Sequence, residues 1–255
     1  MMRYALLPLI IIYRLYFAVV FFLVLTILYP VFWFLLLDER NFKKVWKLKV
    51  FTARLILFLD LIFLRRELRA NNLEGPYVIC ANHSSYLDII LFYAILPKTR
   101  FLFMGKSELL KWPIINIFFK KVDIAVNREK RHSAFRSITR AKREIENGWS
   151  IVIYPEGGIP LTTPRLGQFK NGAFKMAIDL QVPVLPITIL DNWKLFGTDP
   201  VLTGRARPGI SRVIIHEPIP TTGLEKKDLV SLRTQTFETI NEPLLEIYGD
   251  FIEKP

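Results

Sequence analysis

A histidine and an aspartate five residues apart are the side chains of this 255-residue chain best suited to acid–base chemistry. His83 and Asp88 lie in the stretch NHSSYLD, directly after the apolar run at residues 77–81. We expect that run to be a strand, and Ser84 or Ser85 to be the N-cap of the helix that follows. His83 then lies in the loop and can turn its imidazole onto the carboxylate of Asp88, which fixes the tautomer and stabilises imidazolium as a general base requires. The plainer alternative is a histidine that only packs or caps locally.

The loop after a second apolar run, at residues 150–154, contains Glu156, Gly157 and Gly158. Two glycines let the backbone approach a ligand closely, and a glutamate can accept a hydrogen bond from a hydroxyl or orient a cation. A surface turn with a solvated acid has the same composition. A substrate-binding role for Glu156 and Gly157 therefore depends on the motifs around them.

Two basic residues are placed where a phosphate could bind. Lys170 lies in FKNGAF, which opens a predicted helix whose N-terminal amides suit a phosphate. Arg128 directly follows the run at residues 123–127 and can bind a phosphate with two nitrogens. Either residue alone would be interpreted as a solubilising surface cation. Because they occur with the other motifs, we predict that both contact substrate.

Cysteine and histidine usage limits the other chemistries. The single cysteine, Cys80, excludes an internal disulfide, a Cys-rich zinc cluster and a CxxC redox pair. It lies inside an apolar run, where we expect a small buried hydrophobe rather than a nucleophile. His83, His132 and His216 lack the spacing of metal ligands, so we predict no metal site.

Short β-rich runs alternate with helical segments from about residue 73 onward. We predict strands at residues 77–81, 101–104, 123–126, 150–154, 184–189 and 212–216, and helices at residues 86–96, 113–119, 133–147, 171–180 and 225–248. Apolar strands separated by helices indicate an α/β fold, with a mixed sheet covered by helices in an αβα arrangement. Ligands of such sheets bind at the loops that leave the carboxyl ends of the strands, which is where His83 and Glu156 fall.

An uncharged apolar run at residues 15–37 precedes this region. At 1.5 Å per residue it is long enough to cross roughly 30 Å of hydrocarbon. The DERNFKKVWK that follows is unlike a signal-peptide cleavage site, so we expect the segment to stay on the protein and to be embedded in a membrane. The core helix of a soluble domain is the plainer alternative.

A basic amphipathic helix is predicted at residues 43–69. At 100° per residue its basic side chains share one narrow arc: Lys43, Lys47, Arg54, Arg65 and Arg69. For such a helix, lying in the bilayer interface costs less than crossing it. We therefore predict N-terminal membrane-anchoring helices over residues 1–70 and a catalytic domain over residues 71–255, held at the cytoplasmic face.

The net charge is +12, from 35 basic and 23 acidic residues. Residues 1–70 contain 11 basic and 4 acidic residues and so contribute +7 of it. Because this charge adjoins apolar segments, we expect it to meet anionic membrane lipid. Nucleic acid is excluded as a partner, since the sheet lacks interleaved aromatic and basic residues.

Taken in order, NHSSYLD, Arg128, YPEGG, FKNGAF and VPVLP resemble the motifs of the PlsC-type glycerolipid acyltransferases, the family that includes 1-acylglycerol-3-phosphate acyltransferase. The resemblance covers about residues 70–215. It implies that His83 and Asp88 are the catalytic HX4D pair, that Arg128 contacts phosphate and that Glu156 and Gly157 are the third motif.

The resemblance also implies a reaction. An acyl chain passes from acyl-CoA or acyl carrier protein, as co-substrate, to the free hydroxyl of a lysophospholipid, with 1-acylglycerol-3-phosphate giving phosphatidic acid. No resident cofactor and no covalent intermediate are implied.

The chain departs from the family pattern at two places. Gly158 and Ile159 stand where the third motif usually continues with Thr-Arg, and Val122 and Asn127 replace a Gly and an Asp in the second motif. These changes leave open another acceptor, such as a lyso-aminolipid. A non-catalytic lipid-binding membrane protein is a further alternative, against which the intact His83 and Asp88 argue.

Overall fold

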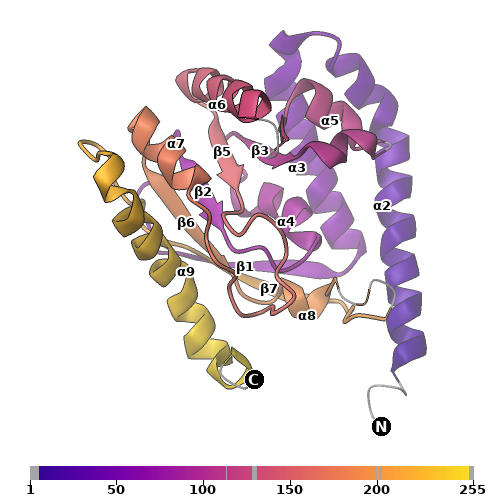
Figure 1. Cartoon of the computed structure of the whole chain (residues 1–255). Helices are drawn as coiled ribbons and strands as arrows, with labels where there is room; N and C mark the ends of the chain where they lie inside the picture. Colours follow the sequence, from indigo (N-terminus) through magenta and orange to yellow (C-terminus); the bar gives the residue numbers. More distant parts are fainter. Residues whose placement is uncertain (1–5, 113, 128–130, 199, 201–202, 253–255) are drawn as a thin grey trace.

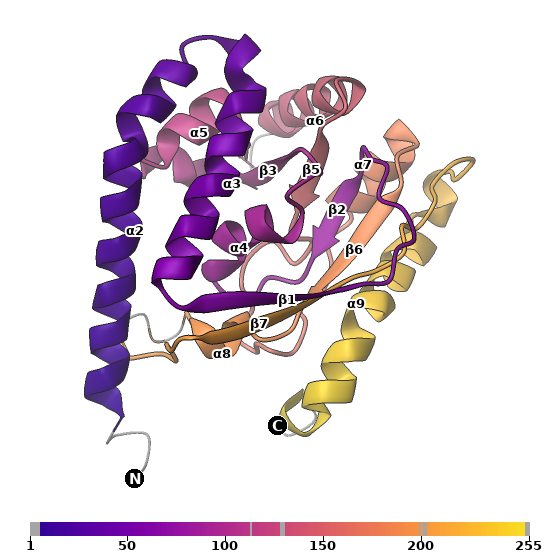
Figure 2. The ribbon, with the colours of Figure 1, turned by 180° about the vertical axis from the view of Figure 1, so that it is seen from behind.

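The computed structural model describes residues 6–112, 114–127, 131–198, 200 and 203–252, without the side chains of residues 131–134. Its seven strands form one sheet in the order β1-β7-β6-β2-β5-β3-β4. Helices cover both faces of this sheet (Figures 1 and 2), which confirms the predicted αβα fold. The strands are β1 (Ile62–Leu68), β2 (Val78–Ala81), β3 (Phe101–Lys106), β4 (Ile124–Val126), β5 (Ser150–Ile153), β6 (Val184–Ile189) and β7 (Gly209–Ile215).

The central strands are apolar along their whole length because both of their faces are covered. Every residue of β2, β5 and β6 is buried, as in sheets with helices on both sides. All neighbouring strands pair in parallel except β6 and β7, which are antiparallel. The carboxyl ends of β2, β3, β4, β5 and β6 therefore meet at one edge of the sheet.

Two helical layers enclose the sheet. On one face lie α3 and α4, with α2 alongside α3, and on the other lie α7 and α9, with α6 at the far end (Figures 1 and 2). The helices are α2 (Leu7–Leu35), α3 (Phe42–Leu59), α4 (Leu87–Ile95), α5 (Asn116–Lys121), α6 (Arg131–Glu146), α7 (Gly172–Leu180), α8 (Asn192–Leu195) and α9 (Leu229–Ile252). Short 3-10 turns are η1 (Glu39–Asn41), η2 (Ser107–Lys111) and η3 (Lys226–Asp228).

Helix α2 is long and apolar enough to cross a membrane, and it lies lengthwise against the rest of the chain (Figure 1). Its inner side packs Phe17 against Phe196 and Phe32 against Phe118, with ring centroids 4.5 and 4.9 Å apart. Buried Arg14 donates to the carbonyls of Gly197, Gly204 and Arg205. The outer side exposes large apolar side chains: Leu9, Ile12, Leu15, Val19, Phe22, Leu23, Ile27 and Val31. The apolar outer side is suited to contact with lipid. The buried Arg14 on the inner side fixes α2 to the rest of the protein.

The predicted amphipathic helix is wrong beyond Leu59, where α3 ends. Leu61 adopts a positive φ of 54°, and residues 62–68 form β1, which pairs in parallel with β7. β1 is an exposed edge strand and has no alternating apolar pattern. The spacing of its charged residues 65–67 therefore resembles the polar face of a helix. The predicted boundary at residue 70 therefore falls after the first strand of the sheet. Core residues of α2 and α3 also belong to the same apolar cluster as the sheet.

The exposed face of α3 keeps the predicted basic character. Lys43, Lys47 and Arg54 are exposed there, and Phe51 and Phe58 lie on the same face with 56% and 65% of their surface exposed. Basic and aromatic side chains thus share one side of the helix, a composition typical of interfacial helices.

Lys49 of α3 points inward and is predicted to be important for stability. Its Nζ lies 2.6 Å from Oδ2 of Asp123, both side chains are buried, and Oδ1 of Asp123 accepts from the amide of Phe103. Replacing Lys49 by Met leaves a buried carboxylate without its counter-charge, so we expect the free energy of unfolding to fall by about 3–5 kcal/mol. Chemical unfolding in detergent measures this, with exposed Lys47→Met as the control. Equal stability of the two variants would contradict the prediction.

Candidate active site

The candidate site residues lie at the edge where the carboxyl ends of the parallel strands meet. His83 follows β2, Glu156 follows β5 and Asn192 follows β6, while Lys106 is the last residue of β3. This is the ligand-binding edge of open α/β sheets. The predicted placement of His83 and Glu156 at this edge is therefore confirmed.

His83 and Asp88 form the predicted pair. Nδ1 of His83 lies 2.8 Å from Oδ2 of Asp88, whose side chain is fully buried, whereas the imidazole keeps 13% of its surface exposed. Helix α4 begins one residue later than predicted, with Tyr86 as N-cap and no side-chain cap. The amides of Ser84 and Ser85 instead donate to Oδ2 of Asp88, at 2.7 and 2.9 Å. Because Nδ1 is held by the carboxylate, Nε2 is the nitrogen that can take up a proton.

A second oxygen of the same carboxylate joins a chain of hydrogen bonds that the sequence did not reveal. Nδ2 of Asn192 donates to Oδ1 of Asp88 at 2.6 Å, and Oδ1 of Asn192 accepts from Oγ of Ser211 at 2.6 Å. Asn192 is fully buried, as is Ser211. Four donors therefore hold the carboxylate in one orientation.

The imidazole also packs against an aromatic ring. His83 stacks on Tyr154, with ring centroids 4.1 Å apart and planes 16° from parallel. Burial raises the pKa of the Tyr154 phenol well above its usual value, so the ring stays neutral. The stack and the Asp88 bond fix the imidazole plane from two sides.

Glu156 ties the His83 loop to the loop that follows β5. Oε1 accepts from the amide of His83 at 2.7 Å and Oε2 from the amide of Gly167 at 2.6 Å. A Cβ on residue 167 would lie 3.0 Å from Oε2, so the close approach requires glycine. Burial raises the pKa of Glu156 to about 7, against the effect of the two amides. Glu156 is therefore not a solvated acid on a surface turn. It is a buried carboxylate that holds the two loops together.

A cation that was not predicted from the sequence, Lys106, lies beside the Gly157-Gly158 turn. Gly157 has a φ of 83°, and its amide donates to the carbonyl of Tyr154 at 3.0 Å. A Cβ on Gly158 would lie 3.7 Å from Nζ of Lys106. The ammonium of Lys106 thus lies beside the position where the family pattern has its Thr-Arg. Its place at the end of β3 is the signal that sequence reading could have used.

Of the other two predicted phosphate contacts, only Lys170 lies among the described residues. Lys170 is exposed, and its backbone amide donates to the carbonyl of Pro155 at 2.8 Å, which places its backbone near the Glu156 loop. Arg128 lies outside the described residues. Among the described residues, no three His, Cys, Asp or Glu side chains are grouped to hold a metal ion, and the predicted lack of a metal site stays a prediction.

A cavity of about 210 Å³ lies next to the His83 loop. Ser84, Thr163, Trp193 and Arg205 are among its lining residues. The buried Oγ of Ser84 has no hydrogen-bond partner among the described residues. The cavity thus combines a hydroxyl able to bond a ligand with a guanidinium.

Cys80 is the residue before the last one of β2, the strand that leads into the His83 loop. It is fully buried, and burial raises the pKa of its thiol above the usual value. The predicted burial of the thiol is confirmed, and its lack of a nucleophilic role stays a prediction. We expect Cys80→Ala to keep turnover within a few-fold of wild type, measured on detergent-solubilised protein, because a thiol of this kind is not a nucleophile. Loss of turnover in a folded Cys80→Ala protein would indicate a thiol acyl-enzyme instead.

Comparison with known proteins agrees with this geometry. The sequence model described as Acyltransferase matches residues 49–190. The chain is 32% identical to a 1-acyl-sn-glycerol-3-phosphate acyltransferase of Chlamydomonas reinhardtii, over 58% of this chain and 43% of that protein. It is 29% identical to 1-acyl-sn-glycerol-3-phosphate acyltransferase beta of Homo sapiens, over 69% of this chain and 62% of that protein. The chain spans about half the length of the curated relatives it matches.

A solved structure shares the fold along almost the whole chain. The crystal structure of the 1-acyl-sn-glycerophosphate acyltransferase PlsC from Thermotoga maritima matches with a TM-score of 0.74, covering 96% of this chain and 97% of that one at 21% identity. The matched range covers more than half of the 255 residues. It includes β2 with the His83–Asp88 pair, β5 with Glu156, and β6. The resemblance drawn from the motifs is thereby confirmed, and the chain belongs to the acyltransferase family.

Proposed function

We propose that this protein transfers an acyl chain from a thioester donor, acyl-CoA or acyl carrier protein, to the free hydroxyl of a lysophospholipid. The preferred acceptor is 1-acylglycerol-3-phosphate, and the product is then phosphatidic acid. The observation that carries the proposal is His83, held through Nδ1 by the buried carboxylate of Asp88 at the ligand-binding edge of the sheet. Curated relatives named for this activity support the choice of acceptor.

The reaction is a direct transfer with His83 as general base. Nε2 of His83 takes the proton of the acceptor hydroxyl while that oxygen forms a bond to the thioester carbonyl carbon. The carbon–sulfur bond then breaks, and the thiolate leaves with the proton that His83 returns. Asp88 stabilises the imidazolium between these two events. No covalent enzyme intermediate forms.

The acceptor phosphate is proposed to lie near the Gly157-Gly158 turn. Lys106 supplies a cation there, beside Gly158. Arg205 lines the cavity next to the His83 loop and supplies a second positive group. Arg128 and Lys170 remain proposed phosphate contacts from the sequence.

A lyso-aminolipid is the second candidate acceptor. Gly158 and Ile159 in place of Thr-Arg favour it, because they remove one guanidinium from the third motif. Lys106 argues for the phosphate-bearing acceptor, since its ammonium lies next to that position.

An acceptor panel tests the proposal. Purified full-length protein is given labelled acyl-CoA or labelled acyl carrier protein together with 1-acylglycerol-3-phosphate, other lysophospholipids or a lyso-aminolipid. We expect labelled phosphatidic acid to form fastest. Faster labelling of the lyso-aminolipid would move the assignment to the second candidate, and no labelled lipid in any combination would reject an acyltransferase activity.

We propose that the apolar side of α2 and the basic face of α3 hold the enzyme on a membrane, with the catalytic domain at the cytoplasmic face. Substituting Lys43, Lys47 and Arg54 by Gln should weaken partition onto anionic vesicles by up to about 10²-fold at low salt, since each basic residue at such a surface contributes about 1 kcal/mol.

Co-flotation with vesicles across a salt series measures this partition. The difference from wild type should vanish near 1 M salt, where the screening length is about 3 Å. A matched control replaces three cations of the opposite layer, Lys175, Lys226 and Lys227, by Gln. Unchanged partition of the first variant at low salt would show that α3 does not meet the lipid.

A further inference from the structure

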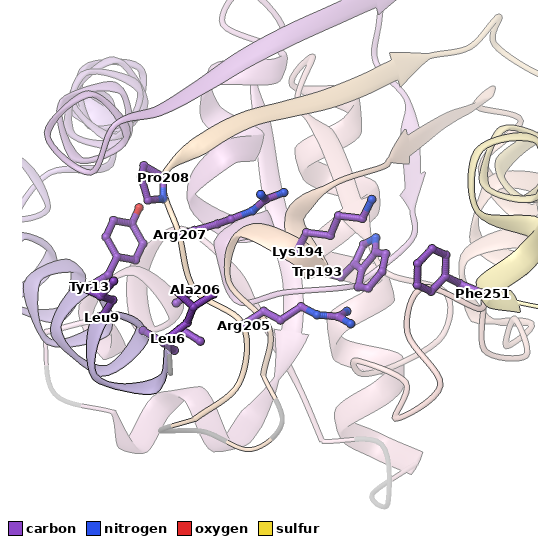
Figure 3. Close-up of a pocket in the computed structure, with 11 residues that line it drawn as sticks. Leu6, Leu9, Tyr13, Trp193, Lys194, Arg205, Ala206, Arg207, Pro208 and Phe251 are labelled. Atoms are coloured by element: carbon purple, nitrogen blue, oxygen red, sulfur yellow. The ribbon is translucent and has the colours of Figure 1, made fainter. Parts of the chain in front are cut away.

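A second and larger cavity lies between the start of α2, the connection from α8 to β7 and the end of α9, and it shares Trp193 and Arg205 with the smaller cavity next to the His83 loop. Figure 3 shows its lining side chains. Its volume is about 600 Å³, within the range of about 300–1,000 Å³ that small-molecule sites occupy. The proposed acyl transfer uses none of the residues that α2 and α9 contribute to it.

Most of the lining is apolar, and part of it is open to the surroundings. Leu6 is the N-cap residue of α2, Leu9 lies in the first turn of that helix, and Phe251 comes from α9. These three side chains expose 49%, 62% and 61% of their surface. The cavity thus continues the apolar outer side of α2, and a water-soluble ligand would leave much of this surface wet.

Cations line the same cavity. Lys194, Arg205 and Arg207 are lining residues, and the charged ends of Lys194 and Arg205 lie on either side of Trp193 in Figure 3. Nζ of Lys194 lies 5.2 Å from the centroid of the Trp193 ring, and the guanidinium carbon of Arg205 lies 4.6 Å from it. Nζ of Lys194 also lies 4.0 Å from the centroid of the Tyr248 ring. Two like charges therefore lie near one indole, and an anion bound at this cavity would offset their repulsion.

The neighbouring acid is already engaged elsewhere. Asp191 accepts from Nε and Nη2 of Arg212 at 2.7 and 2.9 Å, and from the hydroxyl of Tyr248 at 2.5 Å. Burial lowers the pKa of the Lys194 ammonium, Asp191 raises it, and repulsion by Arg212, Arg207 and Arg205 lowers it further. The positive charge at the cavity thus exceeds what Asp191 offsets.

We propose that this cavity binds one anionic phospholipid of the bilayer, separate from the acceptor, with its phosphate against Lys194 and Arg207 and an acyl chain along Leu9 and Phe251. Charge complementarity selects the headgroup, and the apolar lining selects a chain-bearing molecule over free phosphate. The lipid would thereby contact both α2 and α9, which each contribute lining residues to this cavity.

Native mass spectrometry of full-length protein released from a nonionic detergent tests the proposal. Phosphatidylglycerol and phosphatidylcholine with the same chains are titrated separately, and inorganic phosphate is a third probe. We expect the wild type to bind phosphatidylglycerol at least tenfold more tightly than phosphatidylcholine. Equal binding of the two lipids, or binding of inorganic phosphate as tight as that of phosphatidylglycerol, would overturn the proposal without any variant.

Two paired substitutions then locate the site. Lys194→Gln with Arg207→Gln should weaken phosphatidylglycerol binding by about 30-fold, from two contributions of about 1 kcal/mol at 1.4 kcal/mol per tenfold, and leave phosphatidylcholine binding unchanged. Lys226→Gln with Lys227→Gln, exposed at the other end of α9, is the charge-matched control. Equal losses in both variants would show a general effect of surface charge and reject the site.

Discussion

We expect His83→Ala to lower turnover by about 10²–10⁴-fold, the usual contribution of a positioned acid or base. The fold should survive, because the backbone amide of residue 83 still donates to Glu156 and the amides of Ser84 and Ser85 still donate to Asp88. Steady-state turnover of purified protein with a saturating acyl donor measures the effect, and thermal unfolding in the same detergent checks the fold.

A shape-matched variant separates the base from the packing on Tyr154. His83→Gln fills most of the same space and can still donate to Asp88, yet it cannot take up a proton near neutral pH. It should be as inactive as the alanine variant. Turnover near the wild-type value in either variant, on any acceptor that the wild type uses, would remove His83 from the mechanism.

Asp88→Asn should lower turnover by a comparable factor, on the order of 10²–10⁴-fold, with little loss of stability. In this variant the amide oxygen can keep the three donors that Oδ2 has now. The new amide nitrogen faces Asn192, whose own amide can turn over to present its oxygen and then donate to Oγ of Ser211, a hydroxyl that both donates and accepts. Every hydrogen bond is then remade, and only the negative charge beside the imidazole is lost.

Asp88→Ala is the contrasting variant, because it leaves the buried amides of Ser84 and Ser85 without an acceptor. Each orphaned group costs about 1–3 kcal/mol. Thermal unfolding should therefore distinguish the two variants while both lose turnover. Wild-type turnover of Asp88→Asn would show that geometry alone is sufficient and that the charge is unimportant.

The part of the site that could be predicted is the part that is local in the chain. His83 and Asp88 are five residues apart, and a strand followed by a helix brings them together whatever the rest of the fold does. Asn192 lies 104 residues from Asp88, and no spacing in the sequence connects the two. A search among the polar residues at or just after the carboxyl end of each strand would include both Asn192 and Lys106.

The fold was predictable where burial determines the residue types. The runs that became β2, β5 and β6 are apolar throughout because helices cover both of their faces. β1 was missed because an edge strand is exposed on its outer side and can hold Arg65, Arg66 and Glu67 without cost. Lys49 is one of the 11 basic residues among the first 70, and periodicity cannot reveal that its partner Asp123 lies 74 residues later.

The position of Arg14 bears on how the protein is made. Its partner carbonyl at Gly204 is 190 residues further along the chain, and β1 pairs with a strand that ends at Ile215. During synthesis α2 therefore leaves the ribosome long before anything exists to cover its inner side. The bilayer is the apolar phase available to it in that interval, so we expect α2 to be held there first and the sheet to close against it late, as contacts between distant segments do. Membrane targeting and folding of this protein would then be coupled, because the bilayer holds α2 in place until the sheet packs against it.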